Sequence, residues 1–163
     1  MCSSIYPNID MASILATPLT RPEITTTVVD YTRYKTCIHA IRTDVFVHEQ
    51  NIPLELEVDE LDWVSQHVLA LYEGRPIGTG RLTPNGRIGR VAVAQHWRRQ
   101  GVGFCIMRQL LTLASQNRHR EVILSAQQHA IAFYEKLGFQ REGAEFLDVG
   151  IVHVKMRKRL GSL

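Results

Sequence analysis

The spacing of hydrophobic positions divides most of the chain into strand-like and helix-like segments. β-branched residues dominate 24–29 and predict a strand, and apolar residues at helical spacing follow over 34–50. The acidic segment 51–62 contains a proline and predicts a loop. Short apolar runs separated by the turn sequences "EGR" and "PNG" then predict three antiparallel strands, at 66–72, 76–83 and 87–94.

The C-terminal half repeats the alternation of helix and strand. A helix is expected to begin near Gly101, with an apolar face wide enough to include Phe104 and to be heavily buried. The continuous apolar run 121–126 is typical of a strand covered on both faces. Residues 128–139 predict a short helix that ends at a glycine, and two strands close the chain, at 141–148 and 151–158.

This order of elements predicts a mixed α/β (α+β) domain built on one central sheet. Most neighbouring strands are joined by short links and are expected to be antiparallel. The strand–helix–strand unit over 87–126 instead requires a parallel pair with a right-handed crossover.

Composition and net charge narrow the class of protein and the compartment that we expect. The chain has 163 residues and a net charge of +3, which fits one soluble domain with a small anionic ligand rather than a nucleic-acid-binding protein. Three scattered cysteines form neither a disulfide framework nor a metal-ligand spacing, so we expect a cytoplasmic protein without a metal. No segment is long and apolar enough for a membrane span. Residues 1–22 predict a loose leader before a single domain over 23–163, and Met11 is an alternative start.

The stretch "HWRRQGVGFCIM", residues 96–107, carries the candidate chemistry. It joins a strand to a helix, whose first amide groups lack partners and favour an anion. Gly101 and Gly103 allow close approach of the backbone, and Arg98 and Arg99 offer charge-assisted hydrogen bonds, an arrangement that suits a pyrophosphate. Taken alone, the stretch fits a solvated turn equally well. It matches neither a P-loop nor a dinucleotide fingerprint, whose third glycine is replaced by Ile106.

Three motifs in order resemble the GNAT acyltransferases, which bind acetyl-CoA. "RRQGVG" at 98–103 is similar to their (Q/R)-x-x-G-x-(G/A) signature, "VAV" precedes it as in their fourth strand, and "AIAFYEKLGF" is similar to their second signature segment. "VFVHEQNIP", "VDELD", "LSAQ" and "FLDVGIVHVKM" further resemble the ElaA-like subgroup. The resemblance extends over residues 24–159.

The resemblance implies a GNAT fold, with a mostly antiparallel sheet, a splayed parallel strand pair and flanking helices. The pantetheine arm of acetyl-CoA would lie between strands 87–94 and 121–126. The residues implied in binding it are Val91 and Val93 through their backbone, Arg98 by shaping the loop, the amides of Arg99, Gln100, Gly101, Val102 and Gly103 at the pyrophosphate, and Gln127 in place of the commoner asparagine.

The resemblance also implies a chemical role for Tyr134, as the acid that protonates the leaving thiolate. A phenol retains its proton at neutral pH and can donate it as charge develops on sulfur. A backbone N–H near Val91 would hold the oxyanion. The general base stays open among residues that have equally plain structural interpretations: Glu49, Asp59, Glu60, His67 and His153, with Glu49 and His153 favoured.

The sequence thus predicts an N-acetyltransferase that moves an acetyl group from acetyl-CoA to a primary amine of a small molecule or peptide, through a tetrahedral intermediate. Arg90, where related enzymes often carry a carboxylate, suggests an acceptor with its own carboxylate or else a structural role. A catalytically silent acyl-CoA sensor is the alternative. Nucleic-acid binding through "HVKMRKRL" ranks below both, no membrane partner is expected, and a homodimer is a further expectation.

Overall fold

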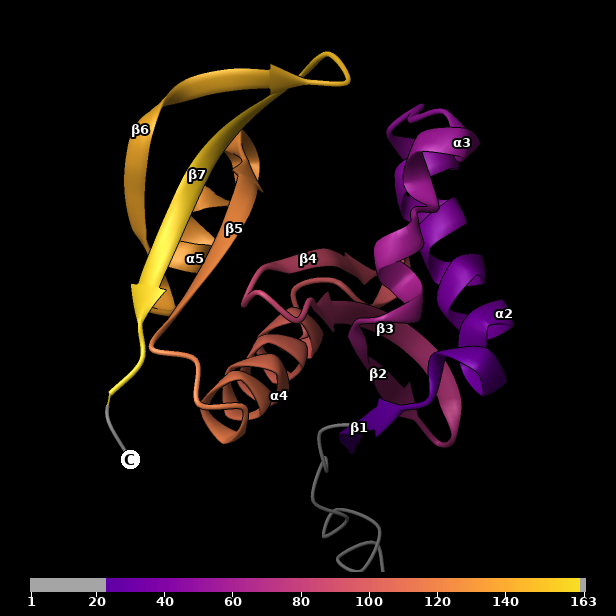
Figure 1. Cartoon of the computed structure of the whole chain (residues 1–163). Helices are drawn as coiled ribbons and strands as arrows, with labels where there is room; N and C mark the ends of the chain where they lie inside the picture. Colours follow the sequence, from indigo (N-terminus) through magenta and orange to yellow (C-terminus); the bar gives the residue numbers. More distant parts are fainter. Residues whose placement is uncertain (1–22, 162–163) are drawn as a thin grey trace, which may run out of the picture.

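The protein is described here from a computed structural model that covers residues 23–161 (Figure 1). The expected leader at 1–22 and the alternative start at Met11 lie outside the described residues. The strands agree with the predicted segments to within two residues at each end. Their bounds are β1 (Ile24–Val29), β2 (Gln66–Tyr72), β3 (Arg75–Leu82), β4 (Ile88–Val93), β5 (Glu121–Gln127), β6 (Gln140–Asp148) and β7 (Ile151–Arg159).

The strands form two sheets instead of the single sheet expected. The first has the order β1-β2-β3-β4 and the second the order β5-β7-β6, and all pairs within them are antiparallel. One parallel bridge, between Arg87 and Ile123, joins the two sheets beside the start of β4. Beyond this bridge β4 and β5 diverge, as Figure 1 shows, so the parallel pair is splayed.

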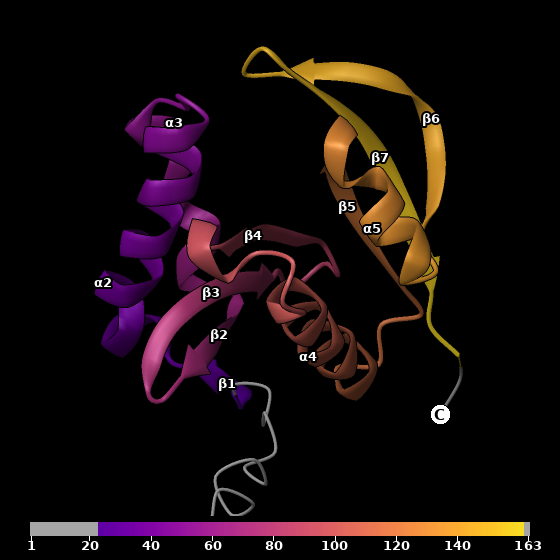
Figure 2. The same ribbon diagram turned by 180° about the vertical axis from the view of Figure 1, so that it is seen from behind.

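The longer helices cover opposite faces of the first sheet. α2 (Tyr31–Arg42) begins at Asp30, whose side chain accepts a hydrogen bond from the Arg33 amide at 2.9 Å. α4 (Val102–Gln116) packs on the other face, chiefly against β3. α5 (Ile131–Lys136) lies against one face of the second sheet, which is seen best from behind (Figure 2).

Glycine is required where α4 crosses β3. A Cβ added at Gly80 would lie 2.9 Å from side-chain carbons of both Ile106 and Leu110, and one at Gly78 would lie 2.8 Å from Ile106. Such separations are shorter than carbon–carbon contacts allow, so these side chains of α4 pack directly on the strand backbone. The close approach fixes the position of the α4 N-terminus relative to the end of β4.

Helical structure extends further into the N-terminal half than the sequence predicted. The helix predicted over 34–50 is present as α2 followed by η1 (Thr43–Glu49), a π-helical segment, whereas the loop expected at 51–62 contains two short helical segments, α3 (Leu54–Glu57) and η2 (Glu60–Trp63). Single 3₁₀ turns, η3 (Gln95–Trp97) and η4 (Gln128–Ala130), precede α4 and α5.

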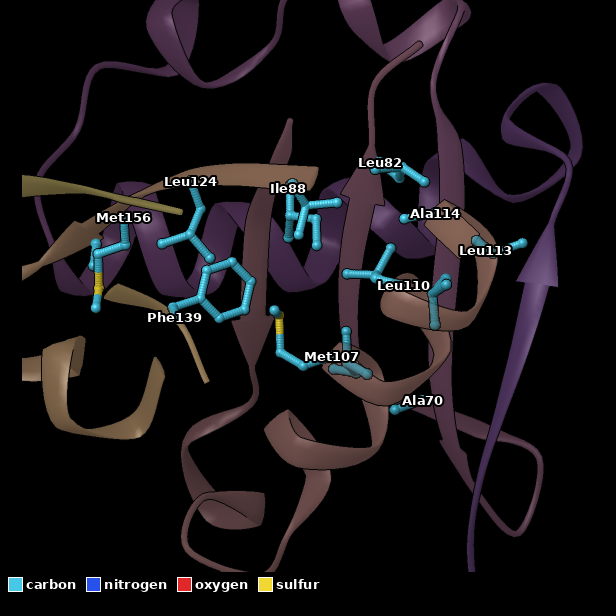
Figure 3. Packing of buried hydrophobic residues seen from close by; sticks show 14 of the residues in the cluster. Ala70, Leu82, Ile88, Met107, Leu110, Leu113, Ala114, Leu124, Phe139 and Met156 are labelled. Atoms are coloured by element: carbon cyan, nitrogen blue, oxygen red, sulfur yellow. The ribbon is translucent and has the colours of Figure 1, made fainter. Parts of the chain in front are cut away.

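One hydrophobic core joins the two sheets beneath α4. Figure 3 shows Met107 and Leu110 of α4 among side chains from both sheets, including Ile88, Leu124 and Met156. A smaller cluster packs α2 against the other face of the first sheet and includes Leu69 and Ala92. Each Å² of buried apolar surface contributes about 25 cal/mol. The core that the two sheets share therefore holds them in a fixed relation although β4 and β5 diverge.

Two predictions of burial are wrong. Strand β5 is covered on one face only: Leu124 and its alternate neighbours are buried, whereas Ser125 and Gln127 on the other face are partly exposed. Phe104, expected in the apolar face of α4, is 46% exposed. Its neighbours Val102 and Ile106 are buried, so Phe104 lies on the solvent-facing side of the helix, where the Arg108 guanidinium carbon lies 5.8 Å from its ring centroid.

Candidate active site

A cleft of about 830 Å³ lies where β4 and β5 separate. The backbone and side chains of β4 form one wall, and β5 with α5 forms the other. The segment after β4 and the connection between β6 and β7 contribute its ends. Of the residues predicted to act in the site, the cleft brings together Val91, Val93, Arg98, Arg99, Gly103, Gln127, Tyr134 and His153.

Strand β4 carries a bulge in the wall of this cleft. Between the pairs Thr79–Ala92 and Arg81–Gly89, the single residue Gly80 of β3 faces two residues of β4, Arg90 and Val91. Arg90 adopts a left-handed conformation, with φ 51°. Because two residues oppose one, regular ladder pairing is interrupted here. The backbone of Arg90 and Val91 therefore leaves the regular β3–β4 register beside the cleft.

The turn at 98–103 presents free backbone donors. Arg99 and Gly101 both adopt left-handed conformations, with φ 62° and 88°. Within the described chain, the amides of 99–104 donate no hydrogen bond, and the next amide, that of Cys105, donates to the Gly101 carbonyl at 3.0 Å. These N–H groups and the dipole of α4 favour an anion. A Cβ at Gly103 would lie 3.4 Å from the Phe133 ring, in the cleft.

Arg98 holds this turn in place. Its Nε donates to the Val93 carbonyl at 3.0 Å, and its Nη2 lies 2.8 Å from a carboxylate oxygen of Glu49. The first bond ties the turn to the end of β4, and the second ties it to η1. Arg98 therefore shapes the loop, while Glu49 is engaged as its ionic partner and does not line the cleft.

Tyr134 projects from α5 into the cleft. Its ring packs edge-on against Phe133 and Phe139, at centroid distances of 5.1 and 5.9 Å. Burial raises the pKa of Tyr134 to about 12. The hydroxyl is therefore protonated at neutral pH, as a hydrogen-bond donor to a developing thiolate must be.

His153 and Gln127 occupy one face of the second sheet, since they are directly paired across β7 and β5. His153 Nδ1 lies 2.8 Å from the Ile151 carbonyl, which can only accept, so Nδ1 carries the hydrogen and Nε2 holds the free lone pair of the neutral ring. Gln127 donates to the Gln50 side chain at 2.7 Å and so connects the second sheet to the end of η1.

The other candidate bases are engaged elsewhere. Asp59 accepts hydrogen bonds from Arg81, which lower the pKa of its carboxyl. His67 is 1% exposed and donates through Nε2 to the Asp62 carbonyl, and burial lowers its pKa. Glu60 is exposed on η2 and does not line the cleft.

A buried ion network supports the wall formed by β4. Arg42, which is fully buried, binds Glu57 and lies 2.7 Å from Asp62, and Arg81 reaches both Asp62 and Asp59 at 2.6 Å. The largest single contribution to the pKa of Asp62 is desolvation by burial, which raises it. The hydrogen bonds and charges of Arg42 and Arg81 together outweigh desolvation and lower this pKa to about 2. Sequence analysis missed this network, because its bonded partners lie 15 to 22 residues apart and resemble solvated charges.

Arg90 belongs to the same network. It donates to the carbonyls of Leu56 and Glu57 and lies 3.1 Å from Asp59. These three bonds hold the 56–59 segment against the bulge of β4. Of the two roles left open for Arg90, the structure supports the structural one.

Two basic side chains of the C-terminal strand β7 form ion pairs within the second sheet. Arg157 binds both Glu121 and Glu142, and Lys155 lies 3.2 Å from Glu142. These pairs engage two of the four basic side chains of β7. Among residues 23–161, no helix has the length and apolar character of a membrane span, and no group of His, Cys, Asp or Glu side chains is arranged for a metal.

The splayed strands, the free amides before α4 and the tyrosine in the cleft together define an acyl-CoA N-acyltransferase fold. Residues 30–160 match the acetyltransferase (GNAT) domain family, and the chain belongs to this family. It is 41% identical to the uncharacterized N-acetyltransferase YjcF of Bacillus subtilis over 123 residues, 72% of this chain and 87% of that protein.

Solved structures show the same fold. An acyl-CoA N-acyltransferase from Pseudomonas aeruginosa superposes with a TM-score of 0.75 at 32% identity, covering 83% of this chain and 99% of its own. ElaA of Escherichia coli gives a TM-score of 0.72 at 25% identity, over 84% of this chain and all of its own. The predicted GNAT fold and the similarity to ElaA are therefore confirmed.

Proposed function

We propose that this protein transfers an acetyl group from acetyl-CoA to a primary amine by direct attack. The observation that carries this proposal is a single cleft with unpartnered amides at one end and a protonated tyrosine within it. The pyrophosphate of acetyl-CoA would accept hydrogen bonds from the amides of 99–103, with Arg99 beside it. The pantetheine arm would then lie along Val91 and Val93 of β4.

His153 is the group best placed to activate the amine. The acceptor enters as an ammonium ion and loses a proton to Nε2 of His153. Its nitrogen then attacks the thioester carbon, and the carbonyl electrons move to oxygen. The N–H of Val91, at the bulge of β4, is the donor for this oxyanion. We prefer His153 to Glu49 as the base because His153 lines the cleft, whereas Glu49 is paired with Arg98 and is not among the lining residues.

Tyr134 acts when the tetrahedral intermediate collapses. The C–S bond breaks and its electron pair goes to sulfur, while the attacking nitrogen gives up its second proton, which passes to the leaving thiolate, so that the neutral amide and the CoA thiol form. A phenol with a pKa of about 12 holds its proton more tightly than a thiol, whose ordinary pKa is near 8.5. Tyr134 therefore stabilises the developing thiolate by donating a hydrogen bond, and no phenolate needs to accumulate.

The test is release of free thiol from acetyl-CoA, measured with polyamines, amino acids, aminosugars and peptide N-termini as acceptors. The proposal predicts amine-dependent release with at least one class and formation of the matching acetyl-amide by mass spectrometry. Binding of acetyl-CoA without release for every acceptor would instead favour a silent acyl-CoA sensor. The Tyr134→Phe variant serves as the control for background hydrolysis.

A further inference from the structure

Five arginines line the cleft, and their partners divide them into two groups. Arg81 and Arg90 pair with Asp59, and Arg98 pairs with Glu49. Arg87 and Arg99 form no ion pair with any carboxylate of the described residues. A guanidinium is always charged near neutral pH and gains most from an oxyanion that accepts two of its N–H groups. Two such groups are therefore available to ligands in one cleft.

The two free arginines stand at opposite ends of β4. Arg87 immediately precedes this strand, and Arg99 belongs to the turn that follows it. A strand of six residues spans about 20 Å at about 3.3 Å per residue. The pyrophosphate proposed at the 99–103 amides is thus far from Arg87, which requires a separate explanation.

A hydrogen bond places Arg87 beside the face of the second sheet that carries His153, the proposed base. Its Nη2 donates to Ser125 Oγ at 2.7 Å, from the start of β4 to β5. Ser125 alternates with the buried Leu124, which faces α4, and so shares a face with Gln127 and its cross-strand partner His153. Arg87 and the proposed base therefore line the cleft from the same face.

We propose that Arg87 binds an anionic group of the acceptor, either a carboxylate or a phosphate. The assignment builds on the proposed acetyl transfer and names the substrate class: an amine that carries its own oxyanion. The polarity of the cleft agrees with it, because the two carboxylates in its lining, Glu57 and Asp148, form no pair with Arg87, and Glu57 is bound to Arg42. The positive charge expected to attract this substrate is at Arg87, since Arg90 is committed to the 56–59 segment.

The experiment compares acceptors that differ only in the anion. Amino acids are paired with their amides, and aminosugar phosphates with the unphosphorylated sugars. Calorimetric affinities are measured on CoA-loaded wild type, Arg87→Gln and Arg87→Lys, together with kcat and KM for those that react. Arg75→Gln, at an exposed arginine outside the cleft, is the matched control.

The proposal predicts that wild type binds the anionic acceptor about 10- to 100-fold more tightly than its neutral counterpart, either among the amino acids or among the aminosugars. Arg87→Gln should remove this preference through KM and leave the neutral acceptors and the acetyl-CoA affinity unchanged, while Arg87→Lys keeps part of it. The carboxylate and phosphate arms identify which anion is bound. Equal affinity within every pair, or a preference that survives in Arg87→Gln, would overturn the assignment.

Failure of the proposed acetyl transfer gives a different pattern. If no acceptor releases thiol, the transfer reaction is refuted, yet the calorimetric comparison still decides whether Arg87 binds the anion. If transfer occurs with neutral and anionic acceptors alike, the function stands and the role of Arg87 does not.

Discussion

Substitution of Gly103 by tryptophan tests the position of the nucleotide site. A Cβ at this residue points toward Phe133, at 3.4 Å, and Val93, at 3.9 Å, and both of these residues line the cleft. An alanine methyl group fits at ordinary contact distance. An indole ring has no room between these side chains and must extend into the space in front of the 99–103 amides.

The loss of affinity follows from the hydrogen bonds that the ring blocks. A hydrogen bond to a charged group contributes about 1.5–3 kcal/mol, so losing two amide–phosphate bonds costs about 3–6 kcal/mol. At about 1.4 kcal/mol per factor of ten, this weakens acetyl-CoA binding by roughly 100-fold to 10,000-fold. Gly103→Ala should bind within about threefold of wild type, because no donor is removed.

Isothermal titration calorimetry with acetyl-CoA measures the effect directly. Circular dichroism and thermal unfolding of both variants show whether the fold is intact, since Gly103 is at the start of α4 and does not belong to the buried core. Undiminished affinity in a folded Gly103→Trp protein would refute the placement of the pyrophosphate at this turn.

Three further substitutions test other parts of the structure. Tyr134→Phe should lower kcat by about 100-fold while the acetyl-CoA affinity is retained, and an unchanged kcat would contradict its role. Arg42→Met leaves the buried Glu57 without its arginine and Asp62 with Arg81 alone, and should lower the free energy of unfolding in urea by about 3–5 kcal/mol, against little change for the exposed Arg33→Met. Burial lowers the pKa of His67 in the folded state, so the unfolded chain binds its proton first and stability falls as pH drops below about 6.5, by up to about 1.4 kcal/mol per pH unit. His67→Gln should make this fall shallower, and an identical slope would refute the assignment.

The sequence predicted the elements that periodicity determines. Alternating and β-branched runs defined the strands, and the glycine–arginine turn before α4 was recognisable because an unpartnered helix terminus and small residues occur together there. The splayed pair at β4 and β5 followed from the family resemblance. The structure adds that, within residues 23–161, the only strand pairing between the two sheets is one parallel bridge, at Arg87 and Ile123.

Features that depend on distant contacts were not predictable in this way. Arg42 reads as a solvated helix charge, and only the folded chain shows that it is buried against acids 15 and 20 residues away. The apolar run of β5 suggested cover on both faces, whereas divergence from β4 leaves one face to the cleft. The bulge that places two β4 residues opposite Gly80 likewise depends on strand register, which local sequence does not fix.

A crystal structure with acetyl-CoA bound is the most direct test of this account. We expect the pyrophosphate oxygens within hydrogen-bonding distance of the amides between Arg99 and Gly103, the pantetheine arm between β4 and β5, and the thioester beside Tyr134. A ligand bound outside this cleft, or a thioester remote from the Tyr134 hydroxyl, would contradict the central claim.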